Sequence, residues 1–79
     1  MNNTLLLKTI LAKCLEVEID KINDSTSMDT LSEWDSIKHL RIVLALEDTF
    51  NINLTEMQSV EIISFELIKL VLKEHGVQI

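Results

Sequence analysis

Hydrophobic residues recur at helical spacing in three segments of the chain. In the first segment, about residues 4–17, the apolar stripe consists of Leu5, Ile10, Leu11, Cys14 and Leu15. In the second, which follows Ile37, the apolar positions are Leu40, Ile42, Val43, Leu44, Leu46 and Phe50. In the third, from Phe65 to about Glu74, they are Phe65, Ile68, Val71 and Leu72. Stripes of this kind are typical of helices with one face on a core, so the pattern predicts three amphipathic helices.

Capping residues place the boundaries of these helices and predict a fourth. Asp35 or Ser36 can cap the second helix, because their side-chain oxygens accept from unpaired first-turn amides. The segment 55–58, Thr-Glu-Met-Gln, matches a capping box and predicts a short helix to about Ile62. Ser64 can cap the last helix, and Gly76 can end it in a left-handed conformation.

Turn-forming polar residues concentrate in one long segment, residues 19–36, because the chain has no proline and only one glycine. A loop of this length has to be anchored or to carry function. Its apolar residues are the expected anchors: Ile19, Ile22, Met28 and Leu31. No strand pattern is present. The sequence therefore predicts one all-α domain over residues 1–79, a small four-helix bundle with three longer helices, a short third helix and a long first loop.

Composition and charge exclude several function classes. The chain has 79 residues, of which 47% are hydrophobic, and a net charge of −6 from 13 acidic and 7 basic residues. This hydrophobic content argues against disorder, and the negative charge argues against nucleic acid binding. No apolar run can span a bilayer, since Lys8 and Lys13 interrupt the N-terminal stretch. The single cysteine, Cys14, fits a reducing cytoplasm, and we expect a monomer there.

Catalytic and metal-binding patterns are missing as well. His39 and His75 are the only histidines, and one cysteine makes no zinc pattern. An EF-hand that started at Asp20 would have Ser25 at its glycine position and Leu31 at its glutamate position. No nucleophile–base pair can be proposed, so we expect no metal and no enzyme activity. A lone helical histidine is more often a surface or hydrogen-bonded residue than a ligand.

The segment 33–40, Glu-Trp-Asp-Ser-Ile-Lys-His-Leu, is the one that suggests a site. It places Ser36 at the junction of the long loop with a helix. One interpretation is plain capping, with Trp34 as an anchor for the loop. The other is functional, because a helix N-terminus favours an attached phosphate and a junction serine is accessible to a modifying enzyme.

Asp35-Ser36-Ile37 resembles the Asp-Ser-Leu signature of acyl carrier proteins, with isoleucine in place of leucine. The resemblance extends over Leu40, Val43 and the run 44–48 followed by Phe50, which look like the family's second helix. Residues 52–54 resemble the family's short exit segment, and the last two predicted helices match in length. Ile22 and residues 24–28 resemble the family's loop before the signature. The similarity thus covers nearly all of the chain.

This resemblance implies a carrier and not a catalyst. A phosphopantetheinyl transferase would use coenzyme A and magnesium to attach 4′-phosphopantetheine to Ser36, with Asp35 helping to position the serine. The thiol of the arm would hold an acyl or aminoacyl group as a thioester and present it to acyl-loading and acyl-transfer enzymes. Ile37, Leu40 and Leu44 would then be apolar contacts for partners or cargo, although each could also be a core residue.

Departures from the family pattern bear on the choice of partners. Fatty-acid carriers usually have a strongly acidic second helix, whereas here Lys38, His39 and Arg41 occupy its first half and only Glu47 and Asp48 are acidic. Charge complementarity decides partner choice. We therefore expect poor docking on general fatty-acid synthases and a specialised polyketide, peptide, lipid or sugar-modification pathway. Trp34 replaces a small residue and can anchor the loop or join a partner surface.

Two alternatives stay open at this point. A peptidyl or D-alanyl carrier has the same fold and the same serine-bound arm, since the loading enzyme selects the cargo. A small helical interaction module without a prosthetic group would use Ser36 only as a cap and would bind a partner helix through Ile37, Leu40 and Leu44. The sequence favours a stand-alone acyl carrier.

Overall fold

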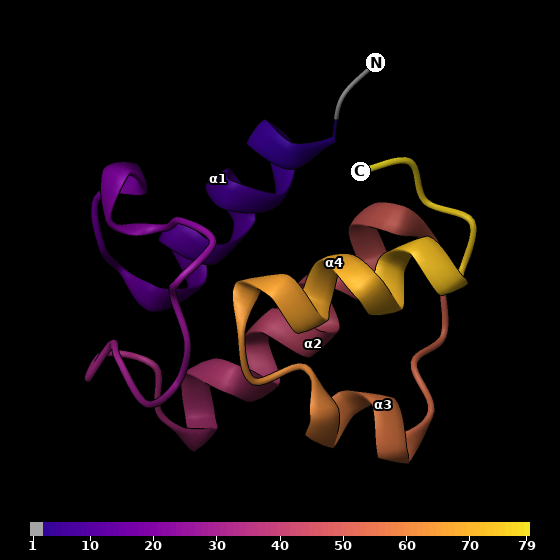
Figure 1. Ribbon diagram of the computed structural model, residues 1–79. Helices are drawn as coiled ribbons and strands as arrows, with labels where there is room; N and C mark the ends of the chain where they lie inside the picture. The colour runs from indigo at the N-terminus through magenta and orange to yellow at the C-terminus, as the bar shows by residue number, and fades with distance from the viewer. Residues whose placement is uncertain (1–2) are drawn as a thin grey trace.

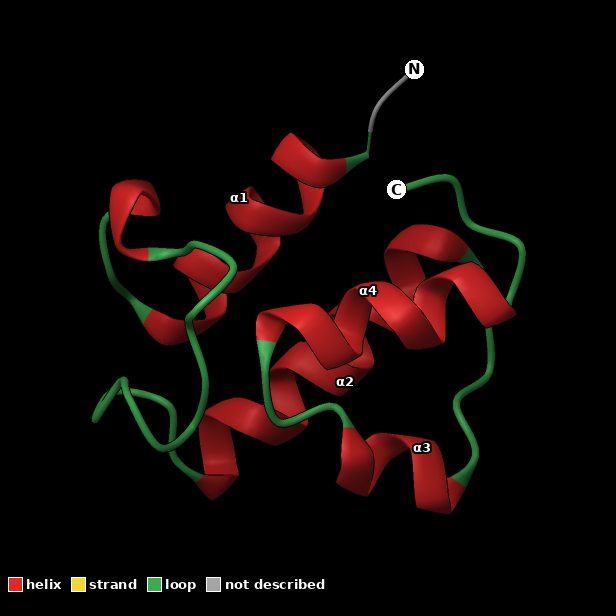
Figure 2. Ribbon diagram, in the orientation of Figure 1, coloured by secondary structure: helices red, strands yellow, loops and turns green. Residues whose placement is uncertain are grey.

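Four α-helices and one short 3-10 turn make up the fold in the computed structural model, which describes residues 3–79 (Figure 1, Figure 2). The elements are α1 (Thr4–Leu15), η1 (Ile19–Lys21), α2 (Ser36–Phe50), α3 (Glu56–Glu61) and α4 (Phe65–Glu74). Within the described residues, extended pairing is limited to an isolated bridge between Ser27 and Ser64. The predicted all-α bundle with a short third helix and a long loop before α2 is confirmed.

The predicted capping residues begin the helices as expected. Asp35 accepts from the Lys38 amide at 2.9 Å and starts α2 at Ser36. Thr55 and Gln58 form both bonds of the capping box at the start of α3. α3 ends at Glu61, one residue before the predicted end. These are contacts within one turn, so the local sequence is sufficient to specify them.

The start and end of α4 follow the same local rules. Ser64 caps it by accepting from the Leu67 amide at 3.1 Å. Beyond its last residue, Gly76 adopts φ 83°, the left-handed conformation that was predicted.

The core lies where α1, α2 and α4 meet, and it includes parts of the long loop. Its fully buried side chains come from both the N-terminal and the C-terminal parts of the sequence, so the core brings these two parts together. They are Leu7, Leu11, Leu15, Ile22, Ile42, Leu46, Ile62, Phe65, Ile68 and Leu72. The two ends of the described residues are also close, since Asn3 Nδ2 donates to the Gln78 carbonyl at 2.9 Å.

The predicted buried stripe of α1 is partly wrong. Leu5 is 67% exposed, whereas Leu7 is fully buried. Leu7, Leu11 and Leu15 follow one another at intervals of four residues and share a face, while Leu5 lies about 200° away from Leu7 around the helix. α1 also ends at Leu15 and not near Val17, because Glu16 adopts a left-handed conformation with φ 59°.

The predicted core face of α2 needs a similar correction. Leu40 and Leu44 are 58% and 57% exposed. α2 instead buries Ile42, Val43 and Leu46. The helix is apolar on two sides, and the inner side is the one that packs against the core.

The anchors of the long loop are predicted correctly with one exception. Ile22 is buried, and Met28 and Leu31 are partly buried against the core. Ile19 is 39% exposed, because the turn η1 buries none of its residues and places the following Ile22 inward.

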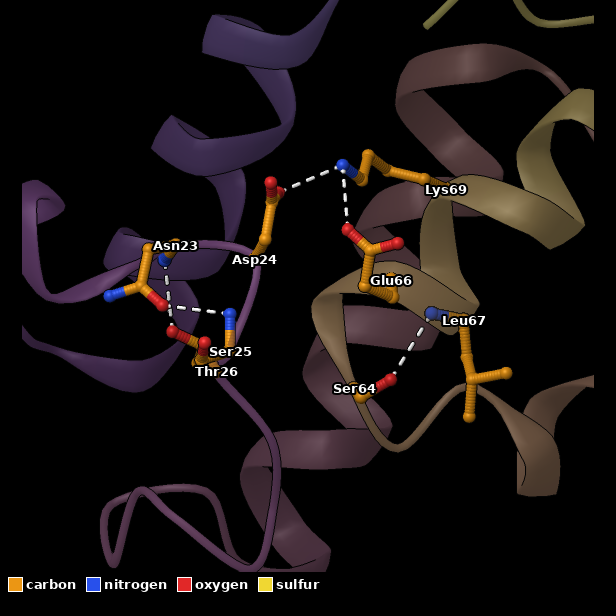
Figure 3. A network of polar contacts seen from close by, with 8 residues as sticks. All are labelled: Asn23, Asp24, Ser25, Thr26, Ser64, Glu66, Leu67 and Lys69. Atoms are coloured by element: carbon orange, nitrogen blue, oxygen red, sulfur yellow. Dashed lines mark hydrogen bonds and ion pairs between the residues drawn. The ribbon is translucent and has the colours of Figure 1, made fainter.

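Polar contacts fasten the same loop to the α3–α4 junction. Met28 N donates to Ile63 O at 3.0 Å, and Phe65 N donates to Thr26 O at 2.9 Å. Nearby, Lys69 of α4 lies 2.9 Å from Asp24 in the loop and 3.0 Å from Glu66 (Figure 3). The loop is therefore held in place next to α3 and α4.

No helix within residues 3–79 combines the length and apolar character needed to cross a membrane.

Candidate functional site

Ser36 is the first residue of α2 and is exposed. The long loop ends immediately before it, and the capping bond of Asp35 fixes where the helix begins. The amides of a first helical turn have no intrahelical acceptor, and the helix dipole makes this end partly positive. The hydroxyl of Ser36 is thus both accessible and set in surroundings that favour a phosphate.

A covalently attached phosphodiester fits these surroundings. α2 has 15 residues, so its dipole is well developed at Ser36. The nearest carboxylate in sequence, Asp35, already accepts a hydrogen bond from the Lys38 amide. A group on the exposed Ser36 hydroxyl would displace no core side chain.

A cavity of about 390 Å³ adjoins Ser36 between α2 and α3. This volume is in the range of small-molecule sites. Three of its lining residues are polar and five are apolar. They are Ser36, His39 and Ser59, and Met28, Leu40, Val43, Val60 and Ile63. The cavity therefore suits an apolar group that is attached at a polar edge.

His39 bridges three parts of the molecule at this cavity. Trp34 Nε1 lies 3.0 Å from His39 Nδ1, and His39 Nε2 lies 2.7 Å from the Ser59 carbonyl oxygen. Of the two expectations for this histidine, a surface or a hydrogen-bonded residue, the structure shows the hydrogen-bonded one. Its link to α3 was missed, because Ser59 is 20 residues away and nothing in the local pattern pairs them.

Trp34 is 2% exposed and belongs to the core. Of the two interpretations of this residue, the loop anchor is confirmed and the partner surface is wrong. The ring can be buried without leaving its one polar group unsatisfied, because the indole N–H donates to His39.

Two of the charged residues expected to contact partners are bonded inside the chain. Lys38 Nζ donates to the Leu15 carbonyl at the end of α1 at 3.3 Å and lies 3.5 Å from Glu16. The Glu47 carboxylate accepts from the Leu54 amide at 2.9 Å and so holds the segment before α3.

Arg41 and Asp48 are the exposed charges of α2 among the residues predicted as partner contacts. Partner contact by these two residues, and by Lys38 and Glu47, stays a prediction.

An exposed apolar surface lies beside Ser36 and extends over two helices. On α2, Ile37, Leu40 and Leu44 are 69%, 58% and 57% exposed. On α3, Met57 and Val60 are 72% and 68% exposed. We call these five side chains the α2–α3 surface. The α3 part was not predicted, although Met57 and Val60 are spaced by three residues on one helix face.

Cys14 is partly buried against the core, in agreement with its predicted packing role. Burial raises the pKa of its thiol, and the nearby Arg41 opposes that rise. The thiolate needed of a nucleophile is therefore disfavoured. Within residues 3–79 there is no group of three or more potential ligands for a metal ion.

Comparison with known proteins identifies the family. A family model described as a phosphopantetheine attachment site matches residues 6–65, which include Ser36 and most of the described fold. A search of curated proteins gave no significant match. The matched range covers well over half of the chain, and the four-helix fold agrees with it. The chain therefore belongs to the phosphopantetheine attachment site family, the carrier domains that bear 4′-phosphopantetheine covalently.

Proposed function

We propose that the chain is an acyl carrier protein and that Ser36 is the residue that carries its 4′-phosphopantetheine. The observation that supports this most strongly is the position of Ser36, exposed at the N-terminus of α2 and on the edge of an apolar cavity. When bound, the prosthetic group supplies a thiol that holds the cargo as a thioester. The chain itself supplies an attachment hydroxyl, a positive helix end and a binding surface, and it catalyses no reaction.

The lining of the cavity supports an acyl cargo over an aminoacyl cargo. Five of its eight residues are apolar, and none is acidic. The ammonium group of an aminoacyl cargo would therefore lose water without gaining a carboxylate partner, which is costly. A peptidyl or D-alanyl carrier remains the alternative with the same arm.

The α2–α3 surface supports partner enzymes that bind through apolar contacts. Lys38 and Glu47 are engaged within the chain, so Arg41 and Asp48 are the α2 charges most accessible to a partner. These two are of opposite sign and give α2 no strong acidic character. We therefore propose a phosphopantetheinyl transferase and the enzymes of a specialised pathway as partners, and poor docking on general fatty-acid synthases.

The test is intact mass spectrometry after incubation with coenzyme A, magnesium and a broad-specificity phosphopantetheinyl transferase. The wild-type protein should gain the mass of one phosphopantetheine, and Ser36→Ala should gain none. Ser32→Ala is the matched control, because Ser32 is an exposed serine in the loop that precedes α2. It should be modified like the wild type.

A folded wild-type protein that gains no mass would contradict the proposal. Ser36 would then be only the first residue of α2, and the exposed Ile37, Leu40 and Leu44 would favour the interaction module. Modification of Ser36→Ala would instead place the attachment at another residue.

A further inference from the structure

α3 forms one wall of the cavity and is the least buried helix of the fold. It has six residues, Glu56–Glu61, and none of them is buried. Two histidines, one on α2 and one just after the end of α4, bond to its middle. His75 Nε2 lies 3.0 Å from Gln58 Oε1, and His39 Nε2 lies 2.7 Å from the Ser59 carbonyl. α3 therefore buries no side chain of its own, and it is held by these polar contacts together with the buried Ile62 that directly follows it.

The bond from His39 satisfies a carbonyl that the helix leaves open. The Ser59 carbonyl would accept from the amide of residue 63 if α3 continued. Instead, Ile63 N donates to Glu61 O at 2.8 Å, because the helix has ended. A carbonyl of this kind needs a hydrogen-bond donor from elsewhere, and the ring of His39 supplies it.

Trp34 determines which ring nitrogen of His39 can act as that donor. An indole N–H can only donate, so His39 Nδ1 must accept from Trp34 Nε1. In the neutral ring the proton is then on Nε2, which points at the Ser59 carbonyl. The buried Trp34 thus binds one nitrogen of the His39 ring, while the other nitrogen binds α3.

The bond between His39 and Ser59 joins two residues that line the cavity. His39 lies one helical turn after Ser36, and Ser36, His39 and Ser59 all line the cavity. The His39–Ser59 contact therefore links the α2 residues that line the cavity to the α3 residues that line it.

We propose that His39 is a positioning residue whose Nε2–H bond to the Ser59 carbonyl sets the distance of α3 from α2 and thereby the width of the cavity that receives the cargo. The part of this inference that concerns cargo rests on the proposed function. The part that concerns α3 does not.

Two substitutions separate the two bonds of His39. In His39→Gln, the side-chain amide nitrogen can take the place of Nε2 and keep the bond to Ser59. In His39→Asn, the side-chain oxygen can take the place of Nδ1 and keep the bond to Trp34, but the shorter chain does not reach Ser59. Trp34 is the only tryptophan, so tryptophan fluorescence reports on the bond between Trp34 and His39.

Amide hydrogen exchange of the unmodified protein tests the α3 part. We expect His39→Asn to raise the exchange rates of residues 59–62 by about 3- to 10-fold, as for the loss of one hydrogen bond. His39→Gln should leave them near wild-type values while changing Trp34 emission. Residues 68–72 of α4 serve as the reference. Equal increases in both helices, or equal effects of Asn and Gln on α3, would overturn the proposal.

Cleavage of an octanoyl thioester by hydroxylamine tests the cargo part on the phosphopantetheinylated protein. We expect faster cleavage in His39→Asn and wild-type cleavage in His39→Gln, the conservative variant that rescues the bond. If α3 exchange separates the variants but cleavage does not, His39 does not control the cavity and that part is overturned. If Ser36 takes no phosphopantetheine at all, the proposed function fails, and the exchange result still decides the α3 part.

Discussion

At the scale of single residues, Asp35 and Ser36 divide two tasks between them. Asp35 directs its carboxylate back to the Lys38 amide and fixes the start of α2. Ser36 is exposed at the same helix end and is the residue that we propose is modified. The two roles are compatible because the cap bond uses the Asp35 side chain and the Lys38 amide and does not involve the Ser36 hydroxyl.

Loss of the Asp35 cap should destabilise the protein measurably. Asp35→Ala removes the bond to the Lys38 amide, which we expect to cost about 1 kcal/mol and to lower Tm by about 4–8 °C in a domain of this size. Asp35→Asn should stay close to wild type, because asparagine caps equally well. Thermal denaturation followed by circular dichroism measures both variants. An unchanged Tm in Asp35→Ala would show that the cap does not hold α2.

At the scale of elements, the loop between η1 and α2 is tied to α4 by Lys69. Its ammonium group lies 2.9 Å from Asp24, 3.0 Å from Glu66 and 5.1 Å from the centre of the Phe65 ring. Figure 3 shows Asp24 of the loop and Glu66 of α4 both pointing toward the ammonium group of Lys69. Hydrogen bonding to Lys69 lowers the pKa of Asp24, and bonds to Asp24 and Glu66 raise the pKa of Lys69.

These shifts fix the pH range in which the tether stabilises the fold. The depressed pKa of Asp24 means that its contribution is present above the ordinary value of 3.8 and is lost as the pH falls through its lower folded value. The raised pKa of Lys69 means that its contribution is present below 10.5 and is lost as the pH rises through its higher folded value. Between these limits both groups are charged.

We therefore expect Lys69→Met to lower the urea midpoint by a constant amount across neutral pH. The difference from wild type should shrink as the pH falls from about 3.8 toward the lower pKa that Asp24 has in the folded protein. Lys73→Met, an exposed lysine of the same helix, is the control and should have a smaller effect. A difference that does not depend on pH would assign the effect of Lys69 to its contact with Phe65 and not to Asp24.

At the scale of the whole molecule, the buried and exposed apolar sides of α2 face different surroundings. The core joins α1, α2 and α4 through residues such as Leu11, Leu46 and Phe65. The α2–α3 surface and the cavity lie on the other side of α2, next to Ser36. Substitutions in the core should therefore change stability, and substitutions on that surface should change partner binding.

Two leucines of α1 test the assignment of the core. Leu7→Ala should cost about 2–5 kcal/mol, because it opens a cavity at a fully buried site. Leu5→Ala, the same chemical change on an exposed site, should stay within about 0.5 kcal/mol of wild type. Urea denaturation measures both. Losses of similar size would mean that α1 is rotated relative to the structure described here.

The sequence alone determined the helices, their caps and the location of Ser36. Asp35, Thr55, Ser64 and Gly76 act within one turn of their own positions, so their local sequence specifies what they do. The buried residues of α4, Phe65, Ile68, Val71 and Leu72, were also predicted in full, because they follow one another at helical spacing.

Only the tertiary structure decided which apolar face of α2 is buried and what the polar side chains near Ser36 bond. α2 has apolar residues on two sides, and periodicity cannot tell Ile42 and Leu46 from Leu40 and Leu44. The bonds of His39, Lys38 and Glu47 reach other elements of the fold, up to 23 residues away in sequence. Such choices depend on how α1, α3 and α4 pack around α2, and this packing is a property of the whole chain and not of any one segment.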